Sequence, residues 1–141
     1  SYSLSIPRVV VITTRGTASA SEAIMNGLAP YMTVVSVGDT TNGKPVGFNG
    51  FIYGEKYFFS PVTFKVVNSE GTGDYYDGIV PNQLATDDVT RDYDNPEEKC
   101  LKEAILYLKT GSFSGKGPGS FSRSKQYSER PPWMNNMFVL E

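Results

Sequence analysis

Two serines and a glutamate lie close together in residues 16–22, which read GTASASE. Ser19 and Ser21 stand among small residues, and Glu22 follows directly. A serine hydroxyl becomes a nucleophile only when a nearby base accepts its proton. The chain contains no histidine, which excludes Ser-His-Asp catalysis, Cys-His catalysis and every histidine-ligated metal site. Lysine is the usual base in such a case, so these serines raise the question of a Ser-Lys pair.

The same stretch also has a purely structural interpretation. Ser19 followed three residues later by Glu22 fits the capping box that begins many helices. The two interpretations are compatible, because a helix N-terminus offers free N–H groups and a positive dipole end that stabilise an oxyanion. The G-x-S-x-G signature is absent, although a strand-to-helix turn made of small residues would expose a serine in a similar way.

The elements around these serines predict a βαβ unit with parallel strands. RVVVIT (8–13) and MTVVSVG (32–38) are apolar runs typical of buried strands, and the residues between them repeat at helical spacing. The loop after the second strand returns to the end of the sheet where the helix begins, which brings Lys44 towards Ser19. Partial burial there would favour the neutral amine that a base requires. The alternative is an ordinary solvated loop lysine.

Beyond this unit we expect two short antiparallel strands and one further helix. FIYGEKYFF (51–59) and PVTFKVVN (61–68) have strand patterns, with a turn at 54–56, and 69–83 reads as a polar loop. The aromatic residues of this hairpin would either line a pocket for an apolar substrate end or form a packed face: Phe48, Phe51, Tyr53, Tyr57, Phe58, Phe59 and Phe64.

The second helix is predicted over 95–110, with Asn95 as its cap, Pro96 in the first position and Gly111 at its end. Its predicted buried stripe consists of Leu101, Ala104, Ile105 and Leu108. The single cysteine, Cys100, is expected to pack in the core.

The overall composition indicates one folded domain followed by a different tail. The chain has 141 residues, 39% of them hydrophobic, and a net charge of −2, which gives no electrostatic reason to expect nucleic acid. Residues 111–141 form a Gly/Ser-rich extension with GSFS repeated, ending in the apolar WMNNMFVLE. This tail is expected to dock on the domain, to support a homo-oligomer, or to remain mobile.

Several of these motifs, taken together, resemble one enzyme family. VVVITTRGTASASEAIMNGL followed by TVVSVGDTTNGKP is similar to the core of the C-terminal processing (tail-specific) serine peptidases of the S41 family. Lys44 lies 25 residues after Ser19, the spacing between nucleophile and base in that family. DGIVPN (77–82) and the helix near 95–110 also match, so the resemblance covers roughly residues 8 to 110.

The resemblance implies an α/β domain with a crotonase-like core and serine-type peptidase activity through an acyl-enzyme. Ser19 would be the nucleophile, Lys44 the general base and the Ala20 N–H an oxyanion-hole donor, while Glu22 would stabilise the helix start. No cofactor or metal is implied. The substrate would be a protein or peptide bound near its C-terminus, in a periplasmic or cell-envelope setting.

Two departures from the family pattern set further expectations. Many members carry a glutamine four residues after the lysine, where this chain has Phe48. Either Asn42 or Asn49 orients Lys44 instead, or the pair works as a dyad, or catalysis is weak.

The family's upstream glycine-rich strand, which gives a second oxyanion donor, does not fit into the seven residues before Arg8. We therefore expect residues 1–110 to be the C-terminal part of a catalytic domain that needs an upstream half, with little or no peptidase activity alone. The rival expectation is a peptidase-like module that binds peptides or assembles with partners without cutting.

Overall fold

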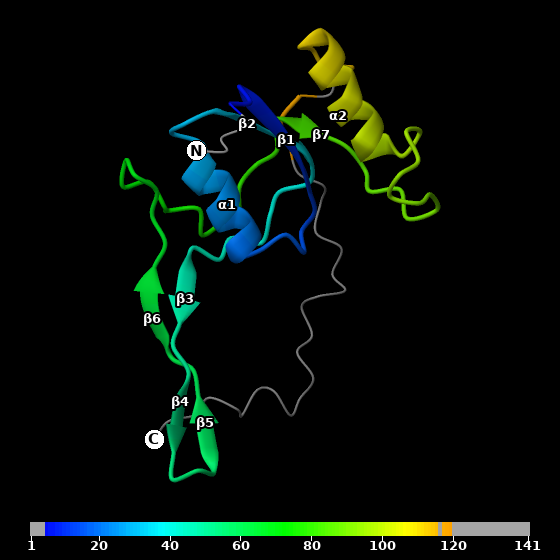
Figure 1. Ribbon diagram of the computed structural model, residues 1–141. Coiled ribbons are helices and arrows are strands. Elements are labelled where there is room, and N and C mark those ends of the chain that lie inside the picture. The colour runs from blue at the N-terminus through cyan, green and yellow to red at the C-terminus, as the bar shows by residue number, and fades with distance from the viewer. Residues whose placement is uncertain (1–4, 116, 120–141) are drawn as a thin grey trace.

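A small parallel sheet forms the centre of the protein. The computed structural model describes residues 5–115 and 117–119 (Figure 1). Strands β1 (Arg8–Thr13), β2 (Thr33–Gly38) and β7 (Gln83–Leu84) lie in the order β1-β2-β7. β1 and β2 pair in parallel over their whole length, which confirms the predicted βαβ unit. β7 was not predicted and begins at the last residue of the stretch predicted as a loop, because two residues carry no strand periodicity of their own.

Helices α1 (Ala20–Leu28) and α2 (Lys99–Thr110) cover opposite faces of this sheet (Figure 1). Successive residues of a strand point to opposite faces. Val37 of β2 packs with Cys100 and Ala104 of α2, whereas Val34 and Ser36 face the side of α1. Cys100 is therefore a core residue as predicted, and burial raises the pKa of its thiol to about 12.

The start of α2 differs from the prediction. Glu98, not Asn95, is the N-cap, and its carboxylate accepts hydrogen bonds from the N–H groups of Cys100 at 3.0 Å and Leu101 at 2.7 Å. Asn95 instead accepts from the Glu97 N–H at 3.0 Å, in a turn before the helix. The predicted end is confirmed, since Gly111 adopts a left-handed conformation with φ of 74°. The prediction that Leu108 is buried is wrong, since the residue is 49% exposed.

The predicted hairpin is an arm that extends away from the sheet (Figure 1). We call residues 46–65 the arm. β3 (Val46–Phe48) pairs with β6 (Val62–Lys65), and β4 (Phe51–Tyr53) pairs with β5 (Tyr57–Phe59), both antiparallel. The expectation of a packed aromatic face is wrong for most of it. Every residue of β4, β5 and β6 is exposed, and only two of its rings, Phe51 and Phe59, stack on each other, with centroids 5.3 Å apart.

The beginning of the extension lies against the sheet. Gly117 accepts a hydrogen bond from the Leu84 N–H at 2.9 Å and donates to the Gln83 side chain at 3.0 Å. The predicted apolar tail, and any oligomer formed through it, lie in residues 120–141, outside the described part. No helix within the described residues is long and apolar enough to cross a bilayer.

Two neighbouring glutamates give a test of the α2 cap. Replacing Glu98 with alanine leaves two first-turn N–H groups and the Asp88 N–H without an acceptor, and it should lower the free energy of unfolding by at least about 1–2 kcal/mol. Glu97, which pairs with Lys102 on an exposed surface, is the matched control, and E97A should cost less than about 0.5 kcal/mol. Urea unfolding followed by circular dichroism measures both. Equal losses in E97A and E98A would contradict the assignment of the cap.

Candidate active site

Ser19 occupies a strained turn between β1 and α1. Its φ of 54° and ψ of −111° lie in a region that residues other than glycine seldom adopt. The turn before it is fixed by the Thr17 N–H, which donates to the Thr14 carbonyl at 2.9 Å, and by the Thr14 N–H, which donates to the Thr17 hydroxyl at 3.0 Å. Such strain costs about 1–3 kcal/mol and persists where the surroundings enforce it, often at functional sites.

Ala20 is the first residue of α1, so its N–H lies at the positive end of the helix. None of the hydrogen bonds in the described part of the chain uses this N–H. The first N–H groups of a helix have no acceptor within the helix, so they are available to an external oxyanion. The Ser19 N–H, by contrast, is already occupied by Glu22.

Glu22 joins the serine turn to the lysine loop. Its side chain is fully buried, and Oε2 accepts hydrogen bonds from the N–H groups of both Ser19 and Lys44, each at 2.8 Å. Oε1 accepts from the Gly43 N–H and from the Thr41 hydroxyl, both at 2.6 Å. Two backbones that donate to one carboxylate oxygen must be adjacent, so the structure brings the Ser19 and Lys44 backbones together.

The hydrogen bonds keep this carboxylate charged in spite of its burial. Burial raises the pKa of Glu22, but the bonds from Thr41, Lys44, Gly43 and Ser19 outweigh it and hold the pKa below its ordinary value of 4.5. The sequence pattern predicted only the half of this arrangement that lies at the helix start. The other half depends on a loop about 20 residues away, which a local capping motif does not reveal.

A third loop closes around the same group. The Thr41 hydroxyl accepts a hydrogen bond from the Ile79 N–H at 2.7 Å, and the Thr41 N–H donates to the Ile79 carbonyl at 3.1 Å. The two loops touch through glycines: a Cβ on Gly43 would lie 2.2 Å from the Tyr76 carbonyl oxygen, and one on Gly78 would lie 2.3 Å from the Thr41 carbonyl oxygen. Both glycines also have positive φ, so no other residue fits either position without strain.

The Lys44 side chain contacts the arm. Its Nζ lies 4.9 Å from the centre of the Phe48 ring, a cation–π distance. No hydrogen bond joins Lys44 Nζ to Ser19 Oγ in the part of the chain that the structure describes. The Asn42 N–H donates to the Thr17 carbonyl at 2.8 Å, which ties this loop to the serine turn. The group in contact with the ammonium is thus Phe48 and not one of the two asparagines considered from the sequence.

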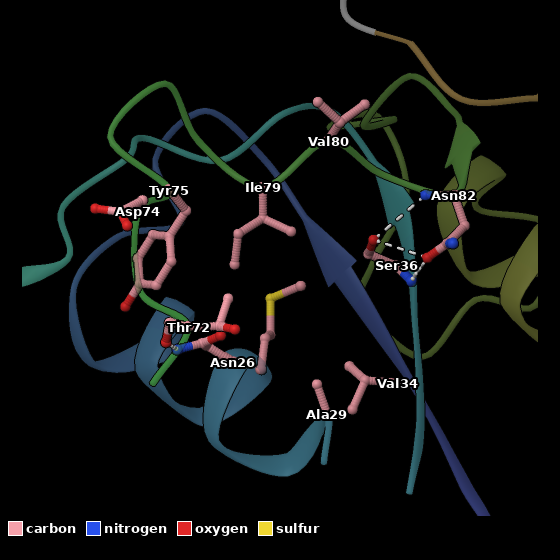
Figure 2. Close-up of a pocket in the computed structure, with 11 residues that line it drawn as sticks. Asn26, Ala29, Val34, Ser36, Thr72, Asp74, Tyr75, Ile79, Val80 and Asn82 are labelled. Carbon is pink, nitrogen blue, oxygen red and sulfur yellow. Dashed lines mark hydrogen bonds between the residues drawn. The ribbon is translucent and has the colours of Figure 1, made fainter. Parts of the chain in front are cut away.

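A separate hollow of about 480 Å³ opens between α1, β2 and the 72–82 loop (Figure 2). Met25, Val34 and Ile79 give it an apolar lining. Ser36 and Asn82 lie at one side, where the Asn82 side-chain oxygen accepts from the Ser36 N–H at 2.8 Å (Figure 2). Neither Ser19 nor Lys44 lines this hollow, so it is distinct from the candidate active site.

Among solved structures the chain is similar to that of a putative S41 protease from Bacteroides fragilis NCTC 9343. The two are 32% identical, with a TM-score of 0.66, and the match covers 74% of this chain and 28% of that one. The chain thus spans little more than a quarter of that protein. No family model matches the chain, and no curated protein matches it. The likeness indicates an α/β fold related to that of the S41 protease.

Replacing Glu22 with glutamine tests its role in holding the site. An amide cannot accept all four hydrogen bonds, so buried N–H groups lose their partner and E22Q should lower the free energy of unfolding by at least about 2 kcal/mol at neutral pH. The wild-type carboxylate has a pKa below 4.5 when folded, so its stabilisation is present above about pH 4.5 and is lost as the pH falls below that value.

Urea unfolding between pH 3 and 7 measures both effects. The control is E70Q, which alters an exposed glutamate and should change stability by less than about 0.5 kcal/mol. A loss in E22Q no larger than that in E70Q at neutral pH would show that Glu22 does not hold the three loops.

Proposed function

We propose that this chain is part of a serine-type peptidase of the S41 kind, with a crotonase-like core. Ser19 is the nucleophile, Lys44 is the general base, and the Ala20 N–H is one donor to the oxyanion. The observation that carries this proposal is the Glu22 carboxylate, which fixes a strained serine turn directly beside the lysine loop. The 32% identity to a putative S41 protease supports the same reaction class.

Each proposed role follows from the position of the group. Ser19 Oγ attacks the substrate carbonyl carbon while Lys44, as the neutral amine, takes the hydroxyl proton. The carbonyl oxygen becomes an oxyanion and accepts a hydrogen bond from the Ala20 N–H at the positive end of α1. Collapse of the intermediate breaks the peptide bond, and Lys44 returns the proton to the leaving amine. Water then hydrolyses the acyl-enzyme, again with Lys44 as base.

The proposal extends to the substrate and its setting through the sequence resemblance. The substrate is a protein or peptide bound near its C-terminus, in the periplasm or cell envelope, and no cofactor takes part. The second oxyanion donor comes from an upstream half of the domain. Since the loss of one oxyanion donor costs about 10²–10³ in rate, peptide hydrolysis by these 141 residues alone is expected to be weak.

A second candidate function is a peptidase-like module that binds peptides or assembles with partners without cleaving them. The observation in its favour is the Lys44 ammonium, which contacts the Phe48 ring and makes no hydrogen bond to Ser19 within the described residues. A neutral amine beside the hydroxyl is what catalysis requires.

A fluorophosphonate probe separates these two functions, because it phosphonylates only activated serines and needs no substrate binding. We expect wild-type protein to be labelled at Ser19, as mapped by mass spectrometry, and S19A to be unlabelled. S21A is the matched control, since Ser21 is an exposed serine two residues away, and it should label as wild type. K44M should label at least about 100-fold more slowly, whereas K56M on the exposed turn of the arm should not.

Labelling at the same rate in K44M would rule out Lys44 as the base. Two results together would favour the non-catalytic module. The folded wild-type protein would show no labelling at Ser19, and the S19A variant would bind peptides as well as wild type does.

A further inference from the structure

Lys44 is held at two points that belong to different parts of the molecule. Its backbone N–H is fixed to Glu22 on the sheet side, and its ammonium lies over the Phe48 ring on the arm side. Lys44 therefore contacts both the carboxylate that fixes the serine turn and the first strand of the arm. The contact between the Phe48 ring and the Lys44 amine therefore affects how readily Lys44 can take the proton of Ser19.

Phe48 lies opposite an irregularity in the strand pair of the arm. Gly47 pairs with Phe64 but Phe48 pairs with Val62, so Thr63 is the extra residue of a β-bulge on β6. Bulges bend the strand that carries them and are frequent beside active sites. A Cβ on Gly47 would lie 2.1 Å from the Phe64 ring, so a larger residue at position 47 would require this exposed ring to move.

An aromatic ring distinguishes the two charge forms of an amine. The negative face of the ring attracts an ammonium group, whereas it has no comparable attraction for the neutral amine. A general base must be the neutral amine and must reach the hydroxyl proton. The Phe48 contact thus holds the Lys44 amine at a location where it makes no hydrogen bond to Ser19 within the described residues.

We propose that Phe48 is a positioning residue that restrains Lys44, because its ring face holds the ammonium and must release it before the amine can act on Ser19. This inference rests on the proposed function for the role of Lys44. Phe48 stands where many members of the resembled family carry a glutamine, so the restraint would set this chain apart from them. The ring is 51% exposed, which leaves the contact open to substitution without loss of the core.

Competitive acetylation of lysines measures the restraint without any need for peptidase activity. Acetic anhydride reacts only with neutral amines, and mass spectrometry gives the labelling of Lys44 relative to Lys56, an exposed lysine of the same arm, in the full 141-residue chain. F48L removes the ring face and keeps an apolar side chain, so the Lys44-to-Lys56 ratio should rise about two- to fivefold. F48M is a second ringless variant and should behave alike, whereas F48Y retains the ring and should match wild type.

The same variants are then treated with the fluorophosphonate probe, and the labelling of Ser19 in F48L and F48M should rise by a similar factor. An unchanged lysine ratio in both ringless variants, or an equal rise in F48Y, overturns the role of Phe48. If Ser19 is labelled but the Lys44-to-Lys56 ratio does not change, only the role of Phe48 is overturned and the peptidase proposal stands. A raised lysine ratio with no labelling of Ser19 in any variant overturns the peptidase proposal instead, and with it the catalytic consequence of the Phe48 contact.

Discussion

The buried carboxylate of Glu22 is the constraint on which the rest of the site depends. A buried charge is tolerated only when its lone pairs are satisfied, and here four donors from residues 19, 41, 43 and 44 satisfy them. If one of these segments moved away alone, the buried carboxylate would lose a hydrogen bond that it needs. The Thr41 hydroxyl, which donates to Glu22, also accepts a hydrogen bond from the Ile79 N–H and so restrains the third loop. The serine turn, the lysine loop and the third loop therefore hold their conformations together.

This coupling also explains how a serine can remain in a disfavoured backbone conformation. The turn at Ser19 would relax if its N–H were free to find another partner, and the bond to Glu22 removes that freedom. The same bond takes the Ser19 N–H out of use as an oxyanion donor. It leaves the Ala20 N–H as the group at the end of α1 that faces no acceptor in the described chain. The contact with Glu22 thus fixes the turn, while the Ala20 N–H stays free because it lies at the start of a helix.

The sequence predicted those features that depend on local pattern. The parallel pair β1–β2 and the left-handed Gly111 follow from periodicity and from the special conformation of glycine, and the approach of Lys44 to Ser19 follows from the order of a βαβ unit. The features that the sequence did not predict depend on contacts between residues that are distant in the sequence. β7 is a strand only because it pairs with β2, and the cap moves to Glu98 because that carboxylate also holds the Asp88 N–H. The hydrogen bond from the Lys44 N–H to Glu22 was also not predicted, because it too joins residues distant in the sequence.

The site lies where the sheet passes into the arm, and this position gives Lys44 two different environments. On the sheet side the loop is fixed by a buried charge and by close glycine contacts, so the Lys44 backbone has little freedom. On the arm side nearly every side chain is exposed, so the Phe48 ring is held mainly by its own strand pair. A glutamine there would direct the amine by a hydrogen bond of fixed geometry. A ring instead attracts the amine through its face, without a hydrogen bond of fixed direction.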